Sequence, residues 1–207
     1  MRLNLTHVHQ LQEQMVTMAP LIVMLSGWAG SGKDVAASIL VKEYGFRRIA
    51  FADALKVDAA KRSGVPLHTF HSAAKDEPLQ TPCSAFLSAK TPRDILLQLA
   101  LQVRATNPDI YADSIICDII ESTREDQFVV SDWRYRREAT RIQEMLPSAR
   151  LLRVRIHRHV TQSSDPSEHD LDNEPMDIII ENNTTIAALE KCVHTIFTPY
   201  LESQSVS

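Results

Sequence analysis

Residues Leu21–Asp34 read LIVMLSGWAGSGKD and predict the fold more strongly than any other stretch of the chain. The first five residues form a continuous apolar run, which is typical of a strand buried on both faces of a parallel sheet. The glycine-rich segment Gly27–Lys33 follows at once, and from Lys33 onward the spacing of apolar residues becomes helical. Gly45 is placed to end that helix as a left-handed cap. The stretch therefore predicts a strand, a glycine loop and a helix in direct succession.

The loop in this stretch matches the phosphate-binding pattern G-x-x-x-x-G-K, and it stands between a predicted strand and a predicted helix as the pattern requires. Its glycines allow successive backbone N–H groups to turn toward a phosphate, and the start of the helix adds partial positive charge. The Lys33 ammonium group can reach the β- and γ-phosphates of a nucleotide, whereas in a plain glycine-rich turn it would only face solvent. We expect ATP to bind to Gly27, Ala29, Gly30, Ser31, Gly32, Lys33 and Asp34.

One position departs from the pattern. Asp34 stands where Ser or Thr would normally hold Mg²⁺ through its hydroxyl group. A carboxylate at this point can bind Mg²⁺ directly or through a water molecule, or it can simply stabilise the start of the helix. The sequence leaves both interpretations open.

Strand and helix patterns alternate along the rest of the chain. They predict strands at 46–51, 127–131, 150–156 and 178–180, and helices at 53–62, 92–103, 108–119, 136–145 and 184–197. This alternation predicts an α/β fold of the P-loop NTPase type, a three-layer sandwich with a mostly parallel central sheet that binds ligands at the carboxyl ends of its strands. Residues 75–90 read as a long loop, and residues 159–174 as a lid.

The composition favours a single cytoplasmic domain that acts on a small molecule. The length of 207 residues suits one domain, which we assign to 18–207 after an N-terminal extension at 1–17. A net charge of -4 argues against polymeric nucleic acid or an anionic membrane as partner. Three widely spaced cysteines favour a reducing compartment, and the apolar run at 15–25 is too short to span a bilayer. The oligomeric state stays open, with a homodimer as one option.

The order of the motifs resembles that in two related groups of P-loop small-molecule kinases. The loop with its Asp34 is similar to that of the phage and viral deoxynucleoside monophosphate kinases, and also to that of the animal-type phosphomevalonate kinases, which share the Asp. Only the loop is specific by itself, but further matches follow in the same order. These are FADALK at Phe51–Lys56, KDEP at Lys75–Pro78, TPR at Thr91–Arg93, VVSDWR at Val129–Arg134 and IENN at Ile180–Asn183.

Two residues after the predicted strand at 127–131 are candidates for catalysis. Asp132 ends a buried strand beside the loop, where a carboxylate can orient Mg²⁺ and its water ligands or accept a proton from the acceptor. Arg134 follows on the same side, and a guanidinium group suits a phosphate because it can donate two parallel hydrogen bonds. The alternatives are a turn residue for Asp132 and a surface ion pair for Arg134.

The resemblance also implies where a phosphorylated acceptor binds. Lys56 and Arg93 stand on or beside predicted helix starts, Lys75 lies in the KDEP motif, and Glu168 lies in the predicted lid. The resemblance implies that these residues hold the acceptor, together with Arg134. For Lys56 and Arg93, an ordinary charge on a helix surface is an equal alternative.

The strand at 150–156 leads three arginines toward the predicted lid. Lid closure could bring one of them onto the transferred phosphoryl group, where such an arginine raises the rate. We choose Arg158 because it lies nearest the lid, and we expect Arg153 and Arg155 to pair with acids on one face of the sheet. By resemblance alone, Asn182 is expected to contact the adenine ring.

Together these patterns predict a kinase that uses ATP and Mg²⁺. A deoxynucleoside monophosphate is the preferred acceptor, because Lys75–Pro78 and Pro92-Arg93 resemble the nucleotide kinases in particular. The first alternative is a phosphomevalonate kinase, whose segments around Asp132 and Asp172 the chain matches equally well. The second is a regulator that binds a nucleotide without catalysis, because a fold or loop alone does not prove an activity.

Overall fold

The computed structural model describes residues 20–122, 127–159 and 169–202. In these ranges five strands form one parallel sheet in the order β2-β3-β1-β4-β5. The predicted α/β fold with its parallel central sheet is confirmed, and the strand before the glycine loop lies at the centre. The strands are β1 (Leu21–Ser26), β2 (Arg47–Ile49), β3 (Phe128–Val130), β4 (Arg150–His157) and β5 (Ile178–Glu181). The predicted extension at 1–17 and most of the predicted lid lie outside the described residues.

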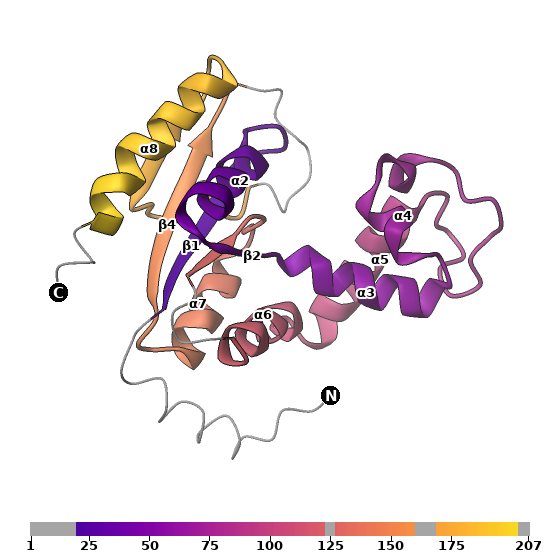
Figure 1. Cartoon of the computed structure of the whole chain (residues 1–207). Helices are drawn as coiled ribbons and strands as arrows, with labels where there is room; N and C mark the ends of the chain where they lie inside the picture. Colours follow the sequence, from indigo (N-terminus) through magenta and orange to yellow (C-terminus); the bar gives the residue numbers. More distant parts are fainter. Residues whose placement is uncertain (1–19, 123–126, 160–168, 203–207) are drawn as a thin grey trace.

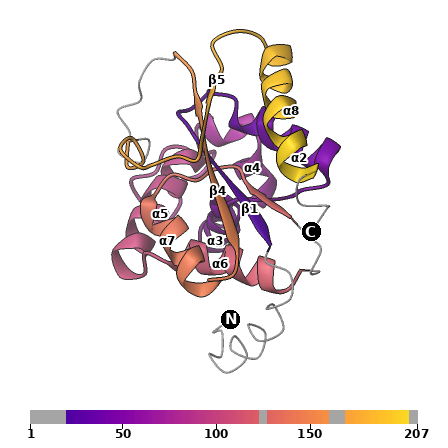
Figure 2. The ribbon, with the colours of Figure 1, turned by 90° about the vertical axis from the view of Figure 1, so that its left-hand side faces the viewer.

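Helices cover both faces of this sheet (Figures 1 and 2). Ile22 and Met24 of β1 point into one hydrophobic cluster, and Val23 and Leu25 point into another, because successive side chains of a strand face opposite ways. This explains why every residue of β1 is buried. The helices are α6 (Ile110–Ile120) and α7 (Arg136–Met145) on the first face, and α2 (Lys33–Tyr44) and α8 (Ile186–Glu202) on the second.

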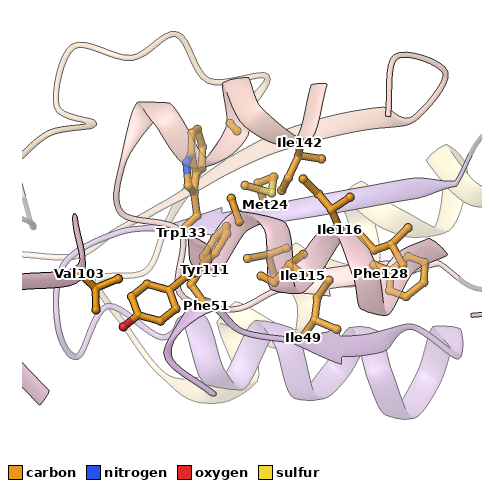
Figure 3. Close-up of a cluster of buried hydrophobic side chains, with 14 of the residues drawn as sticks. Met24, Ile49, Phe51, Val103, Tyr111, Ile115, Ile116, Phe128, Trp133 and Ile142 are labelled. Carbon is orange, nitrogen blue, oxygen red and sulfur yellow. The ribbon is translucent and has the colours of Figure 1, made fainter. Parts of the chain in front are cut away.

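The first cluster positions the segment after β3. Figure 3 shows Trp133 beside Met24, with Ile115 and Ile116 of α6 nearby. Trp133 is only 1% exposed, and its indole Nε1 donates a hydrogen bond to the carbonyl oxygen of Tyr135 at 2.8 Å. The chain between β3 and α7 is thus anchored by a buried ring. This fixes the backbone next to the predicted site residues Asp132 and Arg134.

Residues 51–106 form a lobe to one side of the sheet, which we call the α3–α5 lobe (Figure 1). Its α5 begins as predicted, because Thr91 and Asp94 make a reciprocal capping box and Pro92 occupies the first helical position. The sequence did not predict the short helix α4 or the 3-10 helix that replaces the start of the expected loop. The elements are α3 (Phe51–Ser63), α4 (Leu67–His71), η2 (Ala73–Asp76) and α5 (Pro92–Thr106).

The remaining helices follow their predicted positions with small differences. The helix predicted at 108–119 begins two residues later, at Ile110, which is 39% exposed at its first position. Gly45 ends α2 with a φ of 72°, and its N–H bonds to the carbonyl oxygen of Leu40, which confirms the predicted cap. Across the second face, the Tyr44 hydroxyl is 2.7 Å from His194 Nδ1 of α8. Among the helices of the described ranges, none combines the length and the apolar character needed to cross a membrane.

Candidate functional site

The glycine loop joins the end of β1 to the first turn of α2, at the carboxyl edge of the sheet (Figure 1). Gly27 has a φ of 137° and Gly32 a φ of 107°, backbone angles that side chains rarely tolerate. The Ser31 N–H donates to the carbonyl oxygen of Trp28 at 3.1 Å, which closes a tight turn. Both glycines also lie close to other parts of the chain. A Cβ atom on Gly27 would collide with the carbonyl oxygen of Ile156 in β4.

Lys33 is half-buried and folded back over its own loop. Its Nζ donates hydrogen bonds to the carbonyl oxygens of Gly27 at 2.5 Å and Trp28 at 2.9 Å. The ammonium group is therefore held at the mouth of the loop by two neutral acceptors. An anionic oxygen that entered the loop would be a stronger partner, since hydrogen bonds between charged groups are about twice as strong as neutral ones.

Asp34 is exposed in the first turn of α2, where a negative charge complements the helix dipole. In the described ranges, no three or more His, Cys, Asp or Glu side chains are grouped so that they could hold a metal ion by themselves. A Mg²⁺ site in a phosphotransferase needs only one or two carboxylates besides the phosphates. The chemistry of Asp34 and Asp132 fits this requirement, and their metal roles stay predictions.

Asp132 connects the core to the α3–α5 lobe. Its Oδ1 accepts the N–H of Phe51 at 2.9 Å, and its Oδ2 accepts the N–H of Ala52 at 2.8 Å. These are orphan donors at the start of α3, which a carboxylate satisfies well. Burial raises the pKa of Asp132 above its usual value, and the two backbone hydrogen bonds and Arg134 act against this rise. The carboxyl thus lies between the glycine loop strand and the lobe.

Arg134 lies on a turn that a buried acid stabilises. Oε2 of Glu138 accepts the backbone N–H groups of Arg134 and Tyr135, each at 3.1 Å. Glu138 is 6% exposed, and burial raises its pKa to about 8. Arg104 lies 3.8 Å from Oε1 of Glu138, and its guanidinium carbon is 4.2 Å from the centre of the Tyr135 ring. Two residues from different helices therefore fix the backbone that carries Arg134.

The loop contacts the ends of β4 and β5. Arg158 donates from Nη1 to the carbonyl oxygen of Gly30 at 3.3 Å, so the chosen arginine reaches the loop. Arg155 instead bonds the carbonyl oxygen of Leu171 and pairs with Asp172 at 2.5 Å, as expected for an arginine that pairs with an acid. Which arginine acts on a phosphate stays a prediction, but the geometry favours Arg158.

Asn182 lies beneath the loop and is 6% exposed. Its Nδ2 donates to the carbonyl oxygen of Ser31 at 2.7 Å, across 151 positions of sequence. A Cβ atom on Gly32 would lie 2.6 Å from the same nitrogen, so only glycine fits above it. The predicted contact of Asn182 with adenine stays untested, and its observed partner is the backbone of the loop.

Three of the predicted acceptor residues, Lys56, Lys75 and Arg93, lie in the α3–α5 lobe, and two of them pair with acids. Lys56 is 3.0 Å from Asp53 within α3. Arg93 at the start of α5 bonds both carboxylate oxygens of Asp76, with Nη2 at 3.0 Å from Oδ2. Lys75 is the neighbour of Asp76 and helps to lower its pKa, after the larger effect of Arg93. The KDEP and TPR motifs therefore meet in space, whereas Glu168 lies outside the described residues.

Sequence reasoning missed three features of this region. Asp53 is placed in the first turn of α3, close enough to Asp132 to contribute to the rise of its pKa. Glu138 was not named as a residue of the candidate site, although a Glu three residues into a predicted helix is a recognisable capping signal. Trp28 makes edge contacts with His157 and His169, whose ring centroids are 6.3 and 6.2 Å away. No local pattern could have indicated these ring contacts.

Comparison with known proteins finds a distant similarity to a solved structure. No protein-family model matches the sequence, and no curated protein matches it. Among solved structures, the chain is similar to a "putative kinase" from Chloroflexus aurantiacus J-10-fl, with 11% sequence identity and a TM-score of 0.44. The alignment covers 86% of this chain and 98% of that one.

Proposed function

We propose that this protein transfers the terminal phosphate of ATP, with Mg²⁺, to a deoxynucleoside monophosphate, which gives the deoxynucleoside diphosphate and ADP. One observation carries the proposal. The loop with Lys33 leaves the central strand, while Asp132 follows the neighbouring strand on one side and Arg158 follows the neighbouring strand on the other. An anion in the loop would then have a carboxylate and a guanidinium group beside it.

In this proposal catalysis consists of positioning and charge neutralisation, as is usual for phosphoryl transfer. The loop N–H groups hold the β-phosphate, and Lys33 exchanges its carbonyl partners for phosphate oxygens. Arg134 and Arg158 offer guanidinium groups to the charge that develops on the transferred group. Bound Mg²⁺ would neutralise the same charge, and Asp34 and Asp132 would hold it directly or through water. Every protein group named here lies at the carboxyl edge of the sheet or on the segments that leave it.

The α3–α5 lobe supplies candidate groups for the acceptor. Lys56 and Arg93 pair with Asp53 and Asp76 on surfaces that are partly exposed, and such pairs are weak. A phosphate dianion can therefore displace a carboxylate at low cost. Asp132 bonds the start of α3, so the same carboxyl that faces the loop strand also fixes the base of this lobe. The arrangement suits a reaction between two bound phosphates.

A nucleotide acceptor is preferred because the two motifs that resemble the nucleotide kinases meet through Arg93 and Asp76. The test is an ADP-release assay with MgATP and one acceptor at a time, including the deoxynucleoside monophosphates, their ribose counterparts and phosphomevalonate. Strong stimulation by deoxynucleotides alone supports the proposal. Stimulation by phosphomevalonate would identify phosphomevalonate as the acceptor instead of a deoxynucleotide. Slow ATP hydrolysis that no acceptor stimulates would favour a nucleotide-binding regulator.

A further inference from the structure

The hydrogen bond between Asn182 and Ser31 determines more than the position of one carbonyl group. Asn182 follows β5 directly, and its own N–H donates to the carbonyl oxygen of His157 at the end of β4 at 2.8 Å. Its backbone is thus tied to the sheet, and its buried side chain reaches up to the loop. The amide of Asn182 is a rigid support rather than a mobile surface group.

The planarity of the peptide bond carries this constraint to the next residue. The described residues contain no cis peptide bond, so the carbonyl of Ser31 and the N–H of Gly32 point in opposite directions. Because the Ser31 carbonyl points at the Asn182 amide, the Gly32 N–H points away from that amide. This orientation of the peptide goes together with a φ of 107° at Gly32, which glycine adopts readily.

We propose that Asn182 is a positioning residue for phosphate binding: it fixes the peptide between Ser31 and Gly32 so that the Gly32 N–H is ready for the β-phosphate. This inference rests on the proposed function, since it requires a polyphosphate in the loop. A donor that is oriented before the ligand arrives costs no reorganisation when it binds. Without Asn182, the Ser31 carbonyl would be buried without its donor, and the peptide would be free to rotate.

This role differs in its consequences from a contact with the adenine ring. If Asn182 acts through the loop, its effect depends on the β-phosphate and not on the base. Inorganic tripolyphosphate has the phosphates without the base, and AMP has the base without the β-phosphate. The two ligands therefore separate a role in the loop from a role in base recognition.

Asn183 provides a matched control. It is adjacent to Asn182 and has the same side chain, but it is exposed. Its Oδ1 accepts the His159 N–H at 2.8 Å, and its Nδ2 donates to Glu181 at 3.1 Å. Neither partner belongs to the glycine loop, so Asn183→Ala should leave the affinity for polyphosphates unchanged.

The experiment is calorimetric binding of tripolyphosphate, ATP and AMP to the full chain and to the variants Asn182→Ala and Asn183→Ala. We expect Asn182→Ala to lower the affinity for tripolyphosphate and for ATP by the same factor, roughly tenfold. The affinity for AMP should not change. If the variant bound AMP and ATP more weakly but bound tripolyphosphate with normal affinity, the proposal would be overturned in favour of a contact with adenine. If the unaltered protein bound no tripolyphosphate, the proposed function itself would fail.

A second variant separates positioning from packing. Asn182→Asp keeps the shape of the side chain, but its ionised carboxylate cannot donate to the Ser31 carbonyl. We expect its tripolyphosphate affinity, relative to the unaltered protein at the same pH, to recover as the pH falls and the carboxyl becomes a donor again. An Asn182→Asp protein whose affinity stayed normal at every pH, including alkaline pH at which its carboxyl is ionised, would contradict the proposal, because shape alone would then suffice.

Discussion

The ammonium group of Lys33 donates a hydrogen bond to the carbonyl oxygen of Gly27 at 2.5 Å, six residues earlier in the chain. The side chain of Lys33 thus folds back across the mouth of the glycine loop. The carbonyl is a neutral acceptor, and a phosphate oxygen in the same place would bind the ammonium group more strongly. The contact places the charge at the mouth of the loop, where the proposed function puts a nucleotide phosphate.

Replacement of Lys33 should separate activity from stability. We expect Lys33→Ala to lower the rate of phosphoryl transfer by at least ~10²-fold, because one donor to the developing charge is lost. The thermal unfolding midpoint should change little, since the half-buried side chain bonds carbonyl oxygens of its own loop. Lys42→Ala is the control, because Lys42 is exposed at the other end of α2. Near-normal turnover in Lys33→Ala would reject the role of the loop in catalysis.

The three arginines of the β4 segment should differ in their effects. Arg158 bonds the loop at Gly30, whereas Arg155 bonds Leu171 and Asp172. We expect Arg158→Ala to lower kcat by ~10²-fold or more with a small change in the KM for ATP. Arg153→Ala and Arg155→Ala should leave kcat within a few-fold of normal. A large fall in kcat for Arg155→Ala, with an unchanged unfolding midpoint, would transfer the catalytic role to Arg155.

Arg93 and Asp76 should have opposite effects on the acceptor. Arg93→Ala should raise the acceptor KM far more than the KM for ATP, because the proposed phosphate partner is lost. Asp76→Asn frees the guanidinium group from its carboxylate, and we expect the acceptor KM to stay the same or fall. The ion pair is half exposed, so either change should have little effect on stability. Equal effects of Arg93→Ala on both KM values would exclude the proposed role.

The buried acid Glu138 should make stability depend on pH. Burial raises its pKa to about 8, well above the ordinary value of 4.5, so the folded state holds a proton that the unfolded state has already released. Stability should therefore fall as the pH rises between these two values. Glu138→Gln keeps an oxygen that can accept the N–H groups of Arg134 and Tyr135 and removes the titration. We expect the unfolding midpoint of this variant to vary less with pH, and equal slopes would contradict the assignment.

Local features of the fold could be predicted because they depend on neighbouring residues. The apolar run of β1 needed helices on both faces of its strand, and the structure supplies them. Thr91 caps α5 and Pro92 occupies its first position, and the reciprocal bond from Asp94 lies only three residues from Thr91. The glycine loop likewise carries its own turn geometry. In each case the interaction that determines the structure lies within a few residues of the pattern that predicts it.

The long-range contacts that position the candidate site residues could not be predicted from such patterns. Asn182 bonds Ser31 across 151 positions, and Arg158 bonds Gly30 across 128. Asp132 bonds the start of α3 from 80 positions away, which makes a predicted catalytic residue a structural link as well. These contacts depend on which strands become neighbours in the sheet. A sequence pattern that names a loop and a strand does not specify their register.

The central claim is that the phosphate leaves ATP for a second nucleotide, and the most direct test follows the phosphate itself. ATP labelled in its γ-phosphate is incubated with Mg²⁺, the protein and each deoxynucleoside monophosphate, and the labelled products are separated. We predict that the label appears in the β-phosphate of a deoxynucleoside diphosphate, and that Lys33→Ala abolishes this product. Label that appears only as inorganic phosphate, at a rate that no acceptor changes, would contradict the account.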